Sequence, residues 1–367
     1  MRIVVVTTTT HGGLPKVSPD ERRRLLGKLL KSVSRAFYLS LRILPAGLRE
    51  PIGLAYLLAR AADTIADTRL VPPDERLAQL LSFRRQVEGP AQLEALQTIE
   101  RALTDKQALP AERVLLESLP PAFALLEGME EADRRRVRQV VVTLTEGMEM
   151  DLTTFPAEDS GRVAALPDPA ALDRYTYLVA GCVGGFWTEM LVAHTPALRH
   201  WDVKRMSEIG VRFGKALQMV NILRDIPNDL RIGRCYLPLD ELTQAGVAPE
   251  ELMKVETGPR GRTVLMRCFG VAMEHFKAAE EYLLAHPRSC MRLRLAVLWP
   301  ILLGLGTLDL VARNKSWLDP KVVCRVGQGW VYWVLASSFV AVWSNGILRW
   351  WMDGWRKRVE QGMREEA

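Results

Sequence analysis

One stretch of the chain lines up polar side chains that suit a metal ion and a phosphate group. Four residues stand four, three and four positions apart, the spacing of one helical face: Tyr56, Arg60, Asp63 and Asp67. Apolar residues surround this stripe, so the two carboxylates would repel each other unless a cation offset their charge. Carboxylate oxygens suit Mg²⁺, which commonly takes one or two of them together with phosphate oxygens. A single pair of this kind is also typical of a solvated acidic face.

A second stretch repeats the arrangement. Asp225 and Asp229 again stand four positions apart. Asn221 and Gln218 precede Asp225 by one and two helical turns on the same face. Pro227 lies between the carboxylates and predicts that the helix ends or frays near Asp229. Two such helices facing each other across a cavity would hold magnesium ions that clamp a diphosphate, so we prefer this interpretation to chance repetition.

Arginines stand close to both acidic stretches in the sequence. A guanidinium fork matches phosphate oxygens better than a lysine ammonium does. A place on the solvated surface stays open for each of them, because the chain is rich in arginine. The candidates are Arg35, Arg60, Arg224 and Arg234.

Three glycines cluster in an apolar segment that is predicted to be helical, residues 168–192. A glycine inside a helix costs about 1 kcal/mol relative to alanine, so small side chains are wanted there. Close packing against another helix and room for an apolar chain both explain them. The positions are Gly181, Gly184 and Gly185.

The elements that must position these residues are predicted to be helices. Periodic apolar segments of helical length dominate the chain, and no alternating run bounded by hairpin turns indicates a strand. The predicted fold class is therefore all-α, with helices that include 20–44 and 326–351. No linker is long or biased enough to separate flexible domains. We expect a loose leader over 1–19, one helical catalytic domain over 20–330 and a Trp-rich C-terminal helix over 331–367.

Composition narrows the class of protein. The formal net charge is +6, a modest basic excess that selects no partner by itself. The basic residues are scattered without aromatic interleaving, which argues against nucleic-acid binding. The 5 cysteines form no CxxC pair, so neither a disulfide scaffold nor a structural zinc site is expected. A reducing, cytoplasmic compartment is the expectation.

The C-terminal end has a different character. Residues 326–348 carry no formal charge and include Trp330, Trp333 and Trp343. Such a run is long enough to cross a bilayer, since about 20 apolar residues match the hydrocarbon core. Tryptophan, however, favours the membrane interface. We expect membrane association through this segment, with surface contact preferred to a true span, whereas the apolar run 295–308 is expected to be a core helix.

Five motifs occur in the order found in squalene and phytoene synthases, and the chain resembles this family from about residue 30 to about residue 330. Quoted as they stand here, the motifs are Ser34-Arg35-x-Phe37, Arg60-x-x-Asp63-x-x-x-Asp67, Asp173-x-Tyr175 followed by Gly181-x-Val183-Gly184, Gln218-x-x-Asn221-x-x-Arg224-Asp225-x-x-x-Asp229, and Gly233-Arg234-x-Tyr236-Leu237-Pro238. The resemblance implies a single-domain isoprenoid synthase fold, with antiparallel helices around a central cavity, and head-to-head joining of two prenyl diphosphates.

The resemblance also implies roles for individual residues. The four aspartates of the two acidic stretches bind magnesium and diphosphate, and Arg35, Arg60 and Arg224 bind phosphate. Tyr175 is a proton-transfer or cation-stabilising group, and Tyr56 is counted as catalytic with the first acidic pair. Farnesyl diphosphate is the expected substrate, contacted by Ser34, Phe37, Gln218, Asn221 and Arg234.

A further likeness concerns a reductant. Residues 307–328 resemble the part of eukaryotic-type squalene synthases whose basic residues bind the NADPH phosphate, and Arg325 matches one of them. The other basic position is occupied by Val323, with Lys321 two residues away, and Ala66 stands where squalene synthases commonly have Glu. Magnesium is the expected cofactor, and NADPH accompanies it if the product is squalene.

The activity implied is that of a squalene synthase, which condenses two farnesyl diphosphates through presqualene diphosphate and reduces the product with NADPH. A phytoene or dehydrosqualene synthase, which ends with proton loss and needs no reductant, is the alternative within the family. A non-catalytic helical scaffold that binds membranes or isoprenoids is the alternative outside it. The two intact acidic stretches argue against the scaffold.

Overall fold

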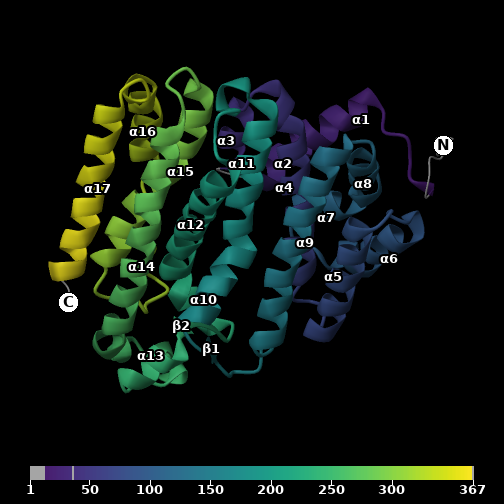
Figure 1. The fold of residues 1–367 in the computed structure, drawn as a ribbon. Helices are drawn as coiled ribbons and strands as arrows, with labels where there is room; N and C mark the ends of the chain where they lie inside the picture. Colours follow the sequence, from purple (N-terminus) through teal and green to yellow (C-terminus); the bar gives the residue numbers. More distant parts are fainter. Residues whose placement is uncertain (1–12, 35–36, 366–367) are drawn as a thin grey trace. The chain divides into compact units, whose positions relative to one another are not determined.

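The computed structural model describes residues 13–34 and 37–365, and most of them lie in helices (Figure 1). The predicted all-α class is confirmed. The chain divides into two compact units, Met1–Leu152 and Thr153–Ala367. The domain boundaries predicted at residues 19 and 330 stay predictions.

The first unit is built from helices that run from purple to blue in Figure 1. One of them, α4, starts after Pro45 and buries apolar side chains along its whole length. Within the helix predicted over 20–44, the described residues are helical at 19–34, with a π-helical turn at Arg24–Leu29, and again at Phe37–Ile43. The helices are α1 (Pro19–Arg23), α2 (Leu30–Ser34), α3 (Phe37–Ile43), α4 (Ala46–Ala66), α5 (Pro73–Glu88), α6 (Leu93–Leu103), α7 (Pro110–Glu117), α8 (Leu119–Glu127) and α9 (Glu131–Thr154).

The second unit packs its helices around two long ones, α12 and α14. It also holds a parallel pair of strands, β1 and β2, in which Ala164 pairs with Arg234. The sequence showed no sign of these strands, because they are too short to display an alternating pattern. The elements are β1 (Ala164–Leu166), α10 (Pro169–Thr176), α11 (Cys182–His194), α12 (Val203–Arg231), β2 (Arg234–Pro238), α13 (Leu239–Gln244), α14 (Gly258–Ala285), α15 (Met291–Ala312), α16 (Gln328–Ala341) and α17 (Asn345–Glu365).

Helices α11 and α12 touch through their backbones. A Cβ added to Gly184 would lie 1.8 Å from the carbonyl oxygen of Gly210, and one added to Gly214 would lie 2.3 Å from that of Ala180, in the π-helical turn Tyr177–Gly181 just before α11. Only glycine permits such an approach. Close helix packing, one of the two explanations left open by the sequence, therefore accounts for Gly184.

The C-terminal helix predicted over 326–351 is wrong as a single element. Helix α16 ends at Ala341 and α17 begins at Asn345. The break has a local cause, because the Ser344 hydroxyl accepts a hydrogen bond from the Ile347 amide at 3.3 Å and so caps the start of α17.

Two helical stretches of the described chain are long and apolar enough to cross a membrane, Pro169–His194 and Met291–Ala312. Both are mostly buried in protein, 56% and 83% of their apolar windows respectively, as core helices are. The core helix expected over 295–308 is thus part of α15. The uncharged run 326–348 forms no such long helix.

Candidate active site

Arg60 joins two carboxylates within the first unit. Its Nη1 donates to Oδ2 of Asp63, one turn along α4, and its Nη2 donates to Oε1 of Glu112 at 2.6 Å. Glu112 comes from the first turn of α7, so the cluster ties α7 to α4. The side chains of Arg60, Asp63 and Glu112 are 27%, 38% and 18% exposed. The Arg60 Nε is buried without a hydrogen-bond partner among the described residues, which leaves one donor of the cluster unsatisfied.

The electrostatics of this cluster favour a bound cation. Burial and the nearby charge of Asp67 raise the pKa of Asp63 to about 6, although Arg60 acts in the opposite direction. Asp67 caps the C-terminal end of α4, where the helix dipole is negative and a carboxylate is unfavourable. Arg60 thus pairs with Asp63 and Glu112, and Asp67 adds a third negative charge nearby. A divalent cation with oxygen ligands fits the remaining negative charge.

Two other predicted residues of the first unit lie on α4 and at the end of α2. The Tyr56 hydroxyl donates to the Val33 carbonyl at 3.4 Å. Ser34 is buried, and its hydroxyl donates to the Leu30 carbonyl at 2.5 Å. Arg35 and the side chain of Phe37 lie outside the described residues, so their predicted roles stay predictions.

The second acidic stretch lies on α12 of the second unit. Both Nε and Nη2 of Arg224 donate to the Asp225 carboxylate, with Nε to Oδ1 at 2.8 Å. The two side chains are about one-third exposed. One turn upstream, Nδ2 of Asn221 donates to Oε1 of Gln218 at 3.3 Å. Arg224 and Asp225 thus form a neutral pair in which the guanidinium donates to both carboxylate oxygens.

The predicted fraying of α12 near Asp229 is wrong. The helix continues through Pro227 to Arg231, so Asp229 lies within its last turn. The Arg231 guanidinium donates to the Pro227 carbonyl, as basic side chains near a helix C-terminus commonly do. Gly233 then ends the helix with a φ of 83°. That left-handed conformation favours glycine and directs the chain into β2.

Strand β2 places two side chains of one motif. The Tyr236 ring stacks on that of Tyr175 with centroids 4.7 Å apart, and the Tyr175 hydroxyl donates to the Tyr236 hydroxyl at 3.2 Å. Phe155 meets Tyr236 edge-on at 5.1 Å. Two positions earlier, Arg234 Nη2 lies 3.6 Å from Oε1 of Glu158. The predicted proton-transfer tyrosine therefore sits in a buried aromatic group, and Tyr236 of that group is two positions from a partly buried ion pair.

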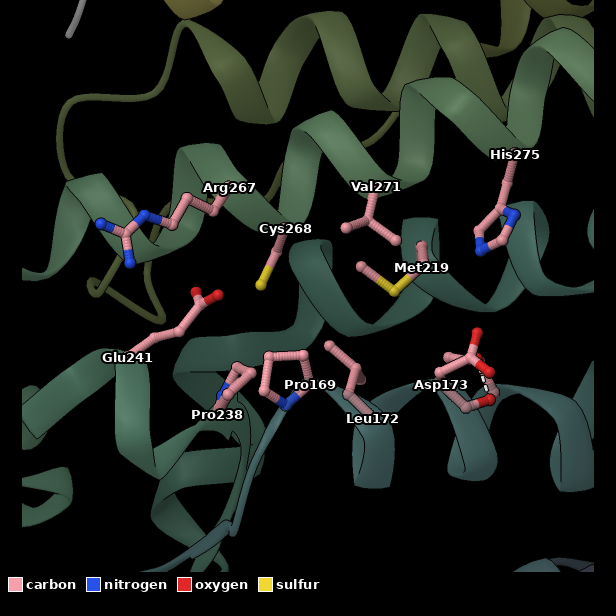
Figure 2. Close-up of a pocket in the computed structure, with 11 residues that line it drawn as sticks. Pro169, Leu172, Asp173, Met219, Pro238, Glu241, Arg267, Cys268, Val271 and His275 are labelled. Carbon is pink, nitrogen blue, oxygen red and sulfur yellow. Dashed lines mark hydrogen bonds between the residues drawn. The ribbon is translucent and has the colours of Figure 1, made fainter.

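A pocket lined by Leu172 and Asp173 of α10, and not by Tyr175, lies between this helix and α14 (Figure 2). Asp173 points into it and accepts a hydrogen bond from Lys215 Nζ at 2.6 Å. Burial, with the charges of Lys215 and Arg212, lowers the pKa of His275 to about 4, so this side chain is neutral at pH 7. Since Asp173 and Tyr175 are two positions apart on a helix, the motif they share serves two different faces of α10.

Arg325, the predicted NADPH contact, lies between α15 and α16. Its side chain is exposed, and its amide donates to the Val323 carbonyl at 3.1 Å. Val323 and Lys321 are exposed as well. One guanidinium and one ammonium are therefore accessible on this loop, and the apolar side chain of Val323 lies between them in sequence.

Within each unit, the structure brings predicted residues together with others that the sequence did not single out. Glu112 has no motif around it, and Glu158 lies in a Pro-rich connection. Of these three residues, Tyr236 alone had a sequence signal for a role in the site, because it shares a motif with Arg234. Across the part of the chain that the structure describes, no group of three or more His, Cys, Asp or Glu has metal-site geometry. Among the described residues, neither acidic pair therefore forms a complete metal site by itself.

The comparison with protein families identifies the class. Residues 30–328 match the squalene/phytoene synthase model, and the chain belongs to that family. A presqualene diphosphate synthase of Zymomonas mobilis is 28% identical over 305 residues, covering 82% of this chain and 88% of that protein. A bifunctional lycopene cyclase/phytoene synthase of Colletotrichum graminicola is 29% identical over 71% of this chain. The chain spans only about two-fifths of the length of that relative, 41%.

Solved structures show the same fold. The structure of TcSQS with the ligand BPH1237 covers 95% of this chain and 98% of its own, with a TM-score of 0.72 at 20% sequence identity. A dehydrosqualene synthase in complex with a ligand gives a TM-score of 0.59 at 18% identity, covering 87% of this chain and 96% of its own. At these identities the likeness concerns the fold alone.

Proposed function

We propose that the protein is a magnesium-dependent prenyltransferase that joins two prenyl diphosphates head to head. The carrying observation is the Arg60 cluster, where Asp63 and Glu112 share one guanidinium, Asp67 adds a third negative charge, and the pKa of Asp63 is raised to about 6. Such a cluster is costly without a bound cation. Family membership and relatives named presqualene diphosphate synthase support the reaction class.

The four aspartates would hold the metal: Asp63, Asp67, Asp225 and Asp229. Bound Mg²⁺ would supply positive charge against the negative charge that grows on a departing diphosphate. Each acidic stretch carries its own arginine. When the carboxylates of Asp63 and Asp225 turn to a cation, the guanidinium groups of Arg60 and Arg224 become available to phosphate oxygens. Arg35 and Arg234 would add further phosphate contacts.

Tyr175 would act on the prenyl chains. Its hydroxyl donates to Tyr236, so Tyr236 fixes the orientation of the group that would accept or release a proton. The stacked rings, with Phe155 at their edge, also offer π faces that stabilise a carbocation and exclude water from it. Tyr56, one turn before Arg60, would act beside the first acidic pair. The remaining predicted substrate contacts are Ser34, Phe37, Gln218 and Asn221.

Farnesyl diphosphate is the proposed substrate and presqualene diphosphate the first product. Reduction to squalene would require NADPH, with Arg325 contacting its phosphate. Val323 occupies one of the two basic positions of the resemblance, so this loop has one cation fewer for the NADPH phosphate. The reduction is therefore proposed separately from the condensation. Curated relatives named phytoene synthase support the alternative, an unreduced product made by proton loss.

Product mass decides among these outcomes. Purified full-length protein is incubated with farnesyl diphosphate and Mg²⁺, with and without NADPH, and in parallel with EDTA. Squalene formed only with NADPH is the expected result. Presqualene diphosphate alone in both reactions would remove the reduction and leave the condensation, whereas dehydrosqualene formed with or without NADPH would contradict the squalene assignment.

The scaffold alternative is tested by binding. Magnesium with pyrophosphate should raise the melting temperature, because a ligand that binds only the folded state stabilises it. The Asp63→Ala, Asp225→Ala double variant should lose that increase. An unchanged melting temperature in the unmodified protein, together with no product from any prenyl diphosphate, would favour the scaffold.

A further inference from the structure

Helices α16 and α17 expose an unusual number of large apolar side chains. Trp350 is 77% exposed and Val340 74% exposed, and the least exposed member of the set is still 44% exposed. We call this set the aromatic face, and it consists of Tyr332, Trp333, Phe339, Val340, Trp343, Ile347 and Trp350. Part of it lines a shallow apolar groove between the two helices. Contiguous apolar patches of this kind mark interaction surfaces.

The inner sides of the same helices are fixed to the core of the second unit. The Trp299 Nε1 donates to the Ser338 hydroxyl at 2.8 Å, and Arg294 Nη2 donates to Oδ1 of Asn345 at 2.6 Å. Trp330 packs against Gly306, where an added Cβ would approach the indole ring to 2.7 Å. The outward orientation of the aromatic face is therefore a consequence of specific packing on α15, and not of a loosely attached helix.

Charge is distributed around this face and not within it. Residues 326–348 carry none. At the border, Arg349 precedes Trp350, and Arg288 and Arg292 are exposed at the start of α15. That end of α15 is tied to the start of α17 by the hydrogen bond from Arg294 to Asn345. An apolar, Trp-rich centre with cations at its edge complements an anionic lipid surface, since tryptophan favours the interface and arginine the headgroups.

We propose that the aromatic face docks the protein onto an anionic membrane surface without crossing it. Helix α16 has 14 residues and is too short to span about 30 Å of hydrocarbon at 1.5 Å per residue. Helix α17 is longer, but it carries charges along its length, including Arg356 and Lys357. Both helices would lie in the plane of the interface, with their aromatic side chains inserted roughly 5–10 Å. This inference is independent of the proposed reaction.

A second copy of the chain is the competing occupant, and the distribution of charge argues for lipid. A dimer that buried this face would gather Arg349, Arg288 and Arg292 of both copies at the edge of one contact, and like charges at an interface oppose association. A layer of anionic headgroups would instead neutralise these arginines. Salt screens such contacts, so binding to anionic vesicles should weaken as the salt concentration rises.

Vesicle flotation of the full chain tests the proposal. The protein should float with vesicles of phosphatidylcholine and phosphatidylglycerol, less with phosphatidylcholine alone, and less at high salt. The Trp343→Ser, Trp350→Ser variant should bind about tenfold more weakly, while Met253→Ser, an exposed apolar residue elsewhere in the second unit, should bind as before. The Arg292→Glu, Arg349→Glu variant should lose the preference for anionic lipid, and Lys204→Glu should retain it.

Depth is measured by quenching of tryptophan fluorescence with lipids brominated at shallow or deep acyl positions. Stronger quenching by the shallow label is expected. Unimpaired flotation of the double tryptophan variant, with its circular dichroism unchanged, would overturn the proposal. So would a stable dimer in sedimentation that the same substitutions dissociate and that vesicles do not displace.

Discussion

The two acidic stretches have similar sequences but different surroundings. On α4, Arg60 is shared between Asp63 and a carboxylate from another helix, Glu112. On α12, Arg224 turns both of its donors to the adjacent Asp225. The first cluster keeps an excess of negative charge, and the second neutralises its first carboxylate with its own neighbour.

The helices are also seated differently. Helix α12 meets α11 through backbone atoms at Gly184 and Gly210. In α4, by contrast, Gly53 faces only leucine side chains, the nearest atom being Leu30 Cδ2 at 3.2 Å from an added Cβ. The acidic stretch of α12 therefore lies on a helix that is packed rigidly against its neighbour. The acidic stretch of α4 instead keeps the repulsion between its carboxylates. The motif specifies the chemistry, and the packing determines what each copy tolerates.

The largest expected effect is on catalysis. The Asp63→Asn variant should lose roughly a thousandfold in turnover, because it removes a group that would hold the cation against the leaving diphosphate. Without magnesium it should melt at a higher temperature than the unmodified protein at pH 7.5, since the charged carboxylate is disfavoured by burial and by Asp67. Scanning calorimetry and product assays measure the two effects on the same samples.

The Asp225→Asn variant is the matched comparison. A similar loss of turnover is expected, but its melting temperature without magnesium should fall, because Asn cannot replace the two-point contact with Arg224. If both variants shifted the melting temperature in the same direction, the proposed difference between the two clusters would be wrong.

The next effect is on stability. Gly184→Ala should reduce the free energy of unfolding by roughly 3 kcal/mol, because the new methyl group meets the Gly210 carbonyl and the helices must separate. Gly185→Ala is its control, since the added Cβ would meet only Val211 at an ordinary 3.6 Å. Alanine there should be neutral or stabilising by up to about 1 kcal/mol. Urea unfolding of the two variants tests this, and equal stabilities would contradict the packing argument.

A smaller effect is expected for the residue that positions Arg60. Glu112→Gln keeps the size of the side chain and removes its charge, so turnover should fall about tenfold to a hundredfold, as is typical for partners that orient a ligand-binding group. The variant should also bind Mg²⁺ and diphosphate more weakly, so the effect should appear in binding measurements as well as in product assays. Glu117→Gln, at the other end of α7, should leave both unchanged.

The sequence was sufficient for the fold class and for both acidic stripes, because helical periodicity and i, i+4 spacing are local properties. It was insufficient for Glu112, whose role depends on how α7 packs on α4. It was also insufficient for the end of α12, where local rules for Pro227 predicted fraying near Asp229 and the helix continues to Arg231. Residue types and spacing thus predicted the acidic pairs, whereas the side chains that contact them from other helices depend on packing.

The C-terminal segment illustrates the same limit. Composition alone favoured one long helix over 326–351, and the capping serine at 344 was too weak a signal to divide it. The two strands were missed for another reason, since β1 and β2 pair across distant parts of the second unit and neither has enough residues to show a period of two.

The smallest expected effect concerns pH. Magnesium needs the ionised carboxylate, so affinity for Mg²⁺ should fall about tenfold per unit as the pH drops below the Asp63 pKa of about 6. Stability without magnesium should respond in the opposite sense. A raised pKa means that the folded state binds the proton more tightly than the unfolded chain, so Asp63 contributes stability as pH falls through about 6 and loses it as pH rises.

Other groups act in the same pH window, and a difference measurement separates them. Burial lowers the pKa of His286 and of His275 to about 4, so acid costs stability at both sites. Subtracting the pH profile of Asp63→Asn from that of the unmodified protein removes their contribution. In Glu112→Gln the acid limb of magnesium binding should move to lower pH, because the charge of Glu112 raises the pKa of Asp63. An acid limb that stayed in place would mean that Glu112 acts on Arg60 through packing alone.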